Sequence, residues 1–201
     1  MLVPVDSEVA VVQARKFWAR WRVRAGYLVA TIYWLLATPT SSSILIGALI
    51  AAFGLVIRGL ASGYLQKDET LATTGPYGVT RNPLYFGSAF LAAGFVAAGR
   101  SWTAGAIVIA YFAVFYYAVM RSEERDVRER FGAAFDEYAR RVPLFFPRFP
   151  RASSDGQSAQ PETRFSWSQY RRNREYQALL GTIAALAAVW LRMWLRALFG
   201  Y

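Results

Sequence analysis

The sequence predicts an all-α protein that crosses a membrane about five times, each crossing needing about 20 apolar residues. Two properties of the 201-residue chain point to this class: 55% of its residues are hydrophobic, and 16% are aromatic. A third is the positive mean hydropathy of +0.22. The apolar residues also fall in blocks, as they do in membrane proteins. The length suits a single domain.

The residue types that are missing exclude several kinds of chemistry. The chain has no cysteine and no histidine, which excludes disulfides, thiolate nucleophiles, Cys/His zinc sites and His-dependent triads. We therefore expect no metal site. Any reaction must use Arg, Glu, Asp, Tyr, Asn and the backbone, or a bound cofactor.

The net charge of +10 raises the question of what the chain contacts. Its basic residues flank apolar blocks instead of forming a patch interleaved with aromatic residues. This arrangement favours anionic lipid headgroups as partners and not nucleic acid.

We divide this single membrane domain into five segments. They are a basic interfacial arm (1–24), two membrane helices (25–65), a core (66–150), a polar linker or lid (151–168) and a C-terminal helix (169–201). Within the arm, bases alternate with Trp18 and Trp21, which fits an interfacial helix or a simple positive-inside anchor equally well. The C-terminal helix could span the membrane or lie on it, and we favour a span.

The apolar blocks give the expected helices and the turns between them. They are Ala25–Ala37, an uncharged turn at Thr38–Ser43, Ile44–Leu65, Leu84–Gly99, Trp102–Met120 continuing into charged sequence, and Ala178–Leu191. Small residues within them favour close helix packing. In the second block these are Gly47, Gly54, Gly59 and Gly63, and in the third Ala89, Ala93 and Ala97. Arg58, within the second block, either snorkels or has a function.

After the fourth block the pattern changes. Phe131-Gly132 predicts a helix end, because Gly is a natural C′ residue. A short amphipathic helix is expected at Ala133–Arg141, with Phe135 and Tyr138 on one face. The prolines of Val142–Pro150 recur too closely for regular helix. We expect Phe145, Phe146 and Phe149 to pack that segment against the membrane surface or a pocket.

The stretch Gly75–Gly87, reading GPYGVTRNPLYFG, has the residues of a helix start. Asn82 suits the N-cap and Pro83 the first helical turn. The free N–H groups of that turn, with Arg81 beside them, make a site for a carboxylate or phosphate. A plain loop-to-helix entry is the alternative, since a single start of this kind is common.

Glu123 and Glu124 lie about one turn past the fourth apolar block. Adjacent carboxylates point about 100° apart on a helix, so at most one of them can face a pocket squarely. The alternative is a charged helix end in which Glu124 pairs with Arg128, four residues later. Most of the 23 basic residues lie on one side of the predicted membrane, and the positive-inside rule makes that side cytoplasmic. Arg81 and the glutamates would then share it.

These motifs, followed by FGAAFDEYARRVPLFFP, resemble the membrane methyltransferases that include isoprenylcysteine carboxyl methyltransferase and the phospholipid N-methyltransferases. The resemblance covers about Gly75 to Pro147. The residues that match the family pattern are Gly75, Pro76, Tyr77, Arg81, Pro83, Tyr85, Gly87, Glu123, Glu124, Phe131, Gly132, Tyr138, Val142, Pro143 and Pro147. Three positions depart from it: Asn82 replaces a His, Val127 a Leu and Phe135 a Tyr. An Asn can donate a hydrogen bond but cannot titrate.

The resemblance implies S-adenosylmethionine as cofactor, held on the cytoplasmic side without a Rossmann fold. We expect its carboxylate at the helix start with Arg81, its amino group or ribose at the glutamates, and its sulfonium near Tyr85. The expected cofactor-binding residues are Gly75, Pro76, Tyr77, Arg81, Asn82, Tyr85, Gly87, Glu123 and Glu124. The expected catalytic residues are Arg81, Asn82 and Arg141.

The methyl acceptor implied is lipophilic, either a prenylated small molecule or a lipid, reached at the cytoplasmic face of a bacterial or archaeal inner membrane. A carboxylate acceptor is favoured, because it is nucleophilic at neutral pH, whereas an amine would need a base and the chain has no His. Arg81 or Arg141 could orient it. The alternatives are phospholipid amine methylation, an NADPH-dependent sterol-type reductase, and a non-catalytic membrane scaffold. Neither the acceptor nor the oligomeric state can be deduced from the residues.

Overall fold

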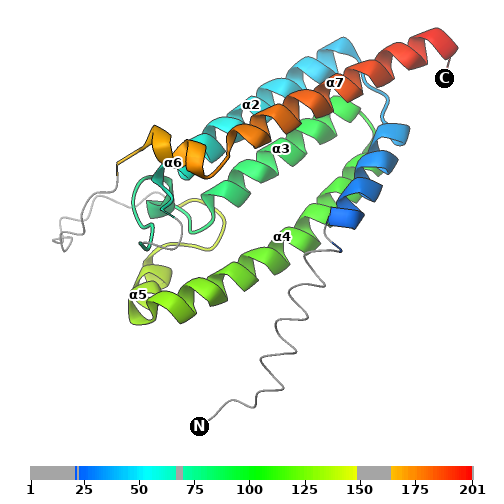
Figure 1. Ribbon diagram of the computed structural model, residues 1–201. Coiled ribbons are helices and arrows are strands. Elements are labelled where there is room, and N and C mark those ends of the chain that lie inside the picture. The colour runs from blue at the N-terminus through cyan, green and yellow to red at the C-terminus, as the bar shows by residue number, and fades with distance from the viewer. Residues whose placement is uncertain (1–20, 22, 67–69, 149–163, 201) are drawn as a thin grey trace.

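The computed structural model describes residues 21, 23–66, 70–148 and 164–200. Within these ranges the chain is helical and has no strand, so the all-α prediction is confirmed (Figure 1). Nearly all of the basic arm predicted over residues 1–24 lies outside the described residues, as does most of the predicted linker.

The helices follow the order of the predicted apolar blocks. A first helix covers Val23–Leu36. It is followed by α2 (Ser41–Tyr64), the short 3₁₀ helix η1 (Gly75–Gly78), α3 (Pro83–Gly99), α4 (Trp102–Phe131), α5 (Ala133–Arg141), α6 (Trp167–Arg172) and α7 (Tyr176–Phe199). The start of α2 differs from the prediction. This helix begins at Ser41 and not at Ile44, because Thr40 and Ser43 form a reciprocal capping box.

Three of the described helices, α2, α4 and α7, are long and apolar enough to cross a membrane. Within the described ranges, the helix Val23–Leu36 and α3 are apolar but shorter than 18 residues, so two of the five expected spans are shorter there than the usual length of about 20 residues. The chain is therefore an integral membrane protein. α7 has 24 residues and extends beyond the predicted run Ala178–Leu191 at both ends, which supports its assignment as a span.

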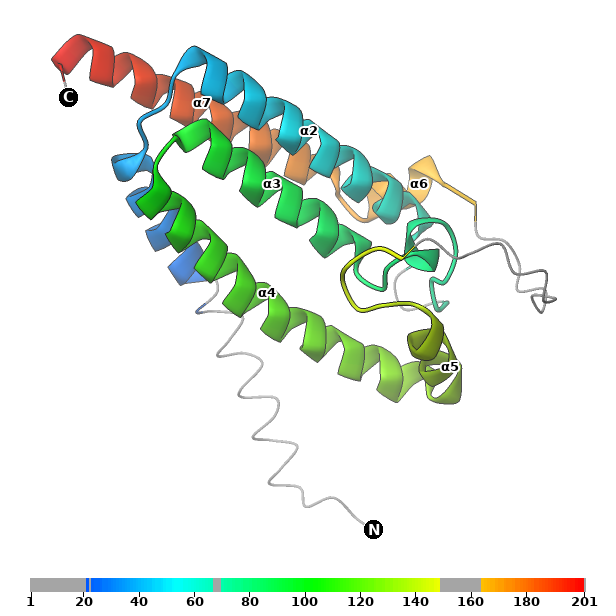
Figure 2. The ribbon, with the colours of Figure 1, turned by 180° about the vertical axis from the view of Figure 1, so that it is seen from behind.

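Glycines hold α2 and α3 in close antiparallel contact. A Cβ at Gly54 would lie 2.6 Å from the carbonyl oxygen of Gly87, and Gly47 faces Gly94 and Ala98 in the same way. The contact ridge of α3 thus consists of Gly87, Gly94 and Ala98 and not of the alanines that we predicted, because glycine lets two backbones approach further than alanine does. α7 lies along the same pair of helices (Figures 1 and 2).

α4 diverges from α2 and α3 toward its charged end (Figure 2). It continues past Met120 to Phe131 as predicted, and Gly132, with a φ of +51°, ends it. The next helix, α5, has the predicted bounds, and it buries Phe135 and Tyr138 as expected. The charged end of α4 is thereby brought next to the loop that precedes α3.

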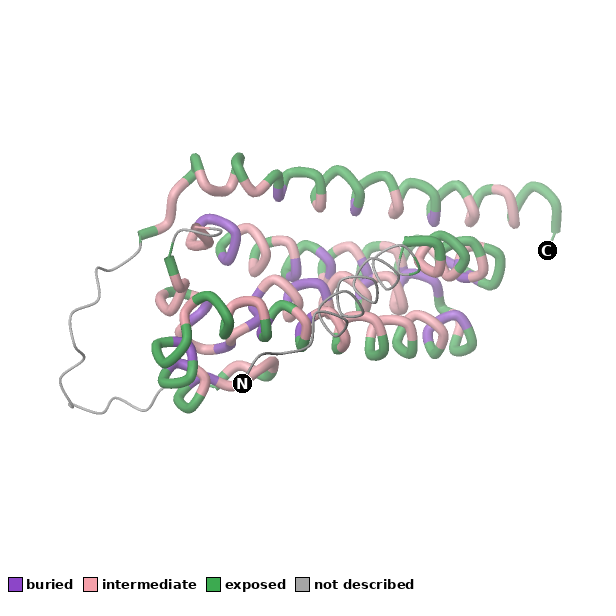
Figure 3. The backbone as a smooth tube through the Cα atoms, turned by 60° about the horizontal axis from the view of Figure 1, so that its bottom comes forward, coloured by how far each residue is buried: buried purple, intermediate pink, exposed green. Residues whose placement is uncertain are grey.

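The C-terminal segment returns to the end of α2. Phe165 occupies the space beside Gly63, and its ring meets Tyr64 edge to face at 6.3 Å between centroids. The C-terminal helix predicted over residues 169–201 is instead divided in two, because α6 ends at Arg172 and Arg174 makes a left-handed turn with φ +53°. α7 then begins. Its buried positions, Thr182 and Val189, face the bundle, while its other side is exposed (Figure 3).

Candidate functional site

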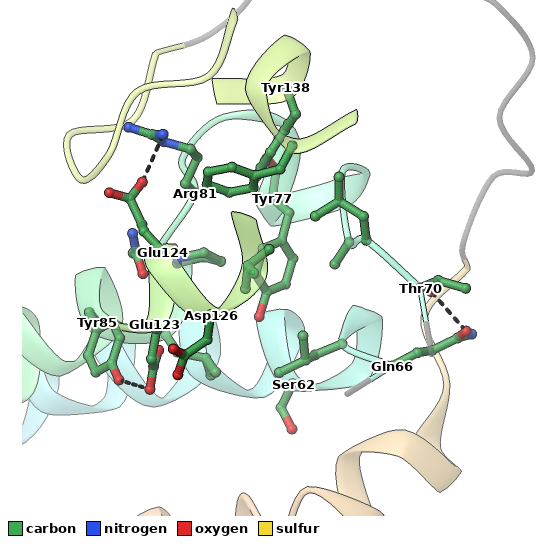
Figure 4. A pocket seen from close by; sticks show the side chains of 18 of the residues that line it. Ser62, Gln66, Thr70, Tyr77, Arg81, Tyr85, Glu123, Glu124, Asp126 and Tyr138 are labelled. Atoms are coloured by element: carbon green, nitrogen blue, oxygen red, sulfur yellow. Dashed lines mark hydrogen bonds and ion pairs between the residues drawn. The ribbon is translucent and has the colours of Figure 1, made fainter. Parts of the chain in front are cut away.

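A cavity of about 550 Å³ lies where α2 ends, α3 begins and the charged end of α4 arrives (Figure 4). This volume is within the range of about 300–1,000 Å³ that is usual for small-molecule sites. Polar and aromatic side chains from α2, η1, α3, α4, α5 and the turn before α7 line it together. Among the described residues, no group of His, Cys, Asp or Glu is arranged to hold a metal ion.

The loop that enters α3 is held by the proline-rich segment after α5. The backbone N–H of Arg81 donates to Pro143 O at 2.9 Å, and that of Arg148 donates to Val79 O at 2.9 Å. The hydroxyl of Thr80, almost fully buried, donates to Phe145 O at 2.9 Å. The carbonyls of Pro143 and Phe145 belong to a segment whose prolines prevent regular helix, and these bonds give them partners. They fix Arg81 at the edge of the cavity.

Asn82 lies at the N-cap of α3, but its side chain does not cap the helix. Its Nδ2 instead donates to Leu144 O at 2.9 Å. The predicted side-chain cap is therefore wrong, because the neighbouring proline-rich segment offers a carbonyl that takes the amide. Pro83 does occupy the first turn of the helix, as predicted, and Asn82, Pro83 and Tyr85 line the cavity.

Arg81 and Glu124 form an ion pair inside the cavity wall. Their Nη1 and Oε1 atoms are 2.8 Å apart, and the two side chains are only 14% and 10% exposed. The other carboxylate oxygen of Glu124 accepts from Arg121 Nη1 at 2.9 Å. The alternative pairing of Glu124 with Arg128 is not formed, because α5 presents Asp136 to Arg128 at 2.8 Å.

Glu123 faces the same cavity from the neighbouring position on α4. Its Oε1 accepts a hydrogen bond from the hydroxyl of Tyr85 at 2.6 Å (Figure 4). Both glutamates line the cavity, but they turn to different partners, as neighbouring positions about 100° apart on a helix require. The cavity is wide enough at this end for Glu124 to turn toward Arg81 while Glu123 turns toward Tyr85.

Two buried tyrosines form the wall between η1 and α5. The hydroxyl of Tyr138 donates to the backbone carbonyl of Tyr77 at 2.7 Å. Burial raises the pKa of Tyr77 far above its ordinary value, and nearby Tyr138 and Glu123 add to the effect. Burial likewise raises the pKa of Tyr138. Both hydroxyls are therefore neutral at physiological pH, and neither can serve there as a base.

Several expected site residues do not line the cavity. Gly75 adopts a φ of +58°, and a Cβ on it would meet the ring of Tyr64 at 2.7 Å. It and Pro76 shape the turn, and Gly87 packs against α2. Arg141 is 64% exposed and pairs with Glu137 at 2.9 Å, because α5 turns this side chain outward. Three phenylalanines lie in the proline-rich segment after α5. Phe145 packs on Phe86, Phe146 is exposed and Phe149 lies outside the described residues.

The structure also adds residues that the sequence did not indicate as site residues. Asn173 and Glu175, from the turn before α7, line the cavity, as do Arg58 and Ser62 of α2. Arg58 pairs with Glu175, so this arginine has an acidic partner within the protein. The one available signal was that Glu175 is the last acidic residue before an apolar run, which is too common to identify a site.

Comparison with known proteins gives this cavity a family context. Residues 43–134 match the model of the phospholipid methyltransferase family. A nickel-cobalt-cadmium resistance protein of Alcaligenes xylosoxydans is 45% identical over 83 residues, which cover 41% of this chain and 38% of the relative. A cobalt-zinc-cadmium resistance protein of Cupriavidus metallidurans is 33% identical over 135 residues, 64% of this chain and 62% of the relative.

A third relative, methanethiol S-methyltransferase 2 of Bradyrhizobium diazoefficiens, is 38% identical over 98 residues, 47% of this chain and 36% of the relative. The matched stretches thus span between 36% and 62% of the curated relatives' own lengths. No solved structure matches the chain significantly. The comparisons therefore relate residues 43–134 of this chain to the phospholipid methyltransferase family and to a methyltransferase.

Proposed function

We propose that this protein transfers a methyl group from S-adenosylmethionine to a lipophilic acceptor at the cytoplasmic face of the membrane. One observation carries the proposal: the part of the chain that matches the family, residues 43–134, supplies most of the cavity lining, from Arg58 to Phe131. The cavity holds both charged groups and aromatic faces, which suits a charged nucleoside cofactor. The positive-inside rule supports the cytoplasmic orientation.

The residues around the start of α3 fit the amino-acid end of this cofactor. The first-turn N–H groups and the helix dipole favour its carboxylate. Arg81 Nε is buried and has no hydrogen-bond partner among the described residues, so it remains a donor for that carboxylate. Glu123, oriented by Tyr85, is placed for the ammonium group. Arg81 and Glu124 balance each other's charge. The amino-acid end of the cofactor is a zwitterion, and its binding adds no net charge to this part of the cavity.

When bound, the cofactor supplies an electrophilic methyl group on a sulfonium. The protein's contribution is to align donor and acceptor and to exclude water, which accounts for most of what a displacement of this kind needs. The rings of Tyr77 and Tyr85 line the cavity and offer faces to a sulfonium.

The acceptor should carry its own nucleophile. The chain has no His, and the two buried tyrosines of the wall stay protonated. A carboxylate needs no base and is our first choice. Since Arg141 points away from the cavity, Arg130, which lines it, takes its place as the residue that orients the acceptor. A thiol is the second choice, because the name of the Bradyrhizobium relative specifies one.

The first test is calorimetric titration of the detergent-purified protein with S-adenosylhomocysteine, with NADPH titrated in parallel. Saturable binding of S-adenosylhomocysteine alone is expected. Binding of NADPH alone would support the sterol-type reductase, and binding of neither would support a non-catalytic scaffold; both results contradict the proposal.

The second test identifies the acceptor class. Protein in lipid nanodiscs is given cofactor with a labelled methyl group and three lipophilic acceptors that differ in one group: a carboxylic acid, a thiol and an amine. Labelling of the acid is expected to be fastest. Arg81→Ala should lose activity, whereas Arg140→Ala, a change of the same type on the exposed face of α5, should keep it. Transfer to the amine alone would contradict the argument from the missing base.

A further inference from the structure

Four polar residues form a second polar corner of the cavity, at the C-terminal end of α2. Arg58 and Ser62 come from α2, and Asn173 and Glu175 come from the turn between α6 and α7. We call this group the α2 corner. In the view of Figure 4, Ser62 lies on the other side of Tyr77 from Arg81 and Glu124. No step in the proposed function uses it.

The α2 corner has hydrogen-bonding capacity that the protein leaves unused. The hydroxyl of Ser62 is buried, with the residue 1% exposed, and it has no hydrogen-bond partner among the described residues. Buried polar atoms without partners are rare and each calls for an explanation. In the same corner, within the described part of the chain, the carboxylate of Glu175 accepts from Arg58 Nε and Nη2. A carboxylate has about four acceptor sites, so this one can accept further hydrogen bonds.

The charge of the corner restricts what it can bind. Arg58 and Glu175 neutralise each other, and Ser62 and Asn173 carry no charge. A carboxylate or ammonium ligand placed here would be a buried charge without a counterion, which is costly. A neutral group that both donates and accepts hydrogen bonds fits best. Hydroxyl groups meet this description: they can donate to Glu175 and accept from Ser62.

Long-range contacts fix this arrangement. Asn173 Nδ2 donates to Ser62 O and to Leu65 O, each at 2.9 Å, and so satisfies carbonyls at the end of α2. Arg58 also donates to Ser88 of α3, and the left-handed backbone of Arg174 sets the turn from which Asn173 and Glu175 project. Neither of these two residues lies within the segment that matches the family.

We propose that the α2 corner binds the hydroxyl groups of a vicinal diol, with Glu175 as acceptor and Ser62 as the neighbouring hydroxyl partner. Carboxylates hold ribose hydroxyls in this way at other nucleotide sites. The ribose of the methyl donor is the ligand that we assign, so the inference rests on the proposed function. Hydroxyl groups of an acceptor headgroup have the same chemistry and form the second arm of the test.

The test compares S-adenosylhomocysteine with its 2′-deoxy and 3′-deoxy analogues by calorimetry. The wild-type protein should bind at least one analogue about tenfold more weakly than the parent, as expected for a lost hydrogen bond to a charged group. Ser62→Ala should bind the parent about fivefold more weakly. It should also discriminate less between parent and analogue, because the partner of the missing hydroxyl is already gone. Glu175→Gln should reduce the discrimination further.

The control is Ser42→Ala, the same change at the other, exposed end of α2, and it should keep wild-type affinity and discrimination. Thermal unfolding confirms that each variant is folded. If Ser62→Ala leaves binding of the cofactor product unchanged but raises the KM of a hydroxylated acceptor, the corner binds hydroxyls of the acceptor. If it changes neither, the α2 corner is structural and the inference is wrong. Failure of the wild-type protein to bind S-adenosylhomocysteine would contradict the proposed function instead.

Discussion

Arg81 and Glu124 approach to 2.8 Å in the wall of the cavity, although 43 positions separate them in the chain and each is largely buried. The pair joins the loop before α3 to the charged end of α4, and Phe135 lies beneath the guanidinium group at 5.9 Å. Each residue therefore holds these elements together, in addition to the ligand-binding role that we propose for it.

Removing one member of this pair should weaken both stability and binding. We expect Arg81→Ala or Glu124→Gln to lower affinity for S-adenosylhomocysteine at least tenfold, because a charge-assisted hydrogen bond contributes about 1.5–3 kcal/mol. Each single change also leaves a partly buried charge without its partner and should lower the unfolding temperature. Replacing both residues with Met should recover much of the stability but none of the affinity. Unchanged calorimetric affinity in both single variants would refute our assignment of this site.

Tyr85→Phe removes a single hydroxyl, the one that donates to Glu123 at 2.6 Å. The ring keeps its edge-to-face contact with Tyr116 at 5.5 Å, so stability should change by less than about 1 kcal/mol. Because Glu123 loses the group that orients it, affinity for S-adenosylhomocysteine should fall about three- to tenfold. Tyr117→Phe, at an exposed position on α4, the helix that carries Glu123, is the control. A larger loss in the control would mean that α4 as a whole is sensitive.

The contact between α2 and α3 should not tolerate even one methyl group at Gly54. A Cβ there would lie 2.6 Å from a backbone carbonyl, which cannot rotate away. We expect Gly54→Ala to destabilise the protein by about 1–3 kcal/mol, the usual range for overpacking. Gly181→Ala on α7 has nothing within 4 Å of the new atom, and it should stabilise its helix by up to about 1 kcal/mol. Thermal unfolding in one detergent compares the two, and equal effects would contradict the close contact.

The wall tyrosines give the protein a dependence on alkaline pH. Burial raises the pKa of the Tyr77 and Tyr138 hydroxyls in the folded state above the ordinary value of 10.0. Their contribution to stability is therefore complete below pH 10 and is lost as the pH rises above about 10, where the unfolded chain releases these protons more readily. The unfolding temperature should fall in that range, and less so in Tyr77→Phe. An absorbance titration that showed Tyr77 ionising near pH 10 would contradict the burial.

Tyr138→Phe tests whether the hydroxyl of Tyr138 holds the turn at η1 against α5. It removes the buried bond from the Tyr138 hydroxyl to the carbonyl of Tyr77 and leaves that carbonyl without a partner, at a cost of about 1–3 kcal/mol. The unfolding temperature should fall, and the turn at η1 should become less protected from hydrogen exchange. Full protection at η1 would show that the bond is not needed to hold the turn.

The sequence alone determined the local structure. The apolar blocks gave α2, α3 and α4 to within a few residues, Gly132 marked the break, and α5 was predicted with its bounds and its buried face. Helix periodicity and turn chemistry are encoded by residues a few positions apart, so they can be read without knowledge of the fold. The motif from Gly75 to Gly87 likewise located the start of α3 and one wall of the cavity.

Only the tertiary structure decided which charges meet and which residues share the cavity. Glu124 turns to Arg81 and not to Arg128, and Arg141 points to Glu137 instead of the cavity. Arg58 meets Glu175, 117 positions away. Such pairs depend on how the helices cross and on which carbonyls a neighbouring segment leaves unsatisfied, as at Asn82. These are long-range properties, and no local pattern of residues records them.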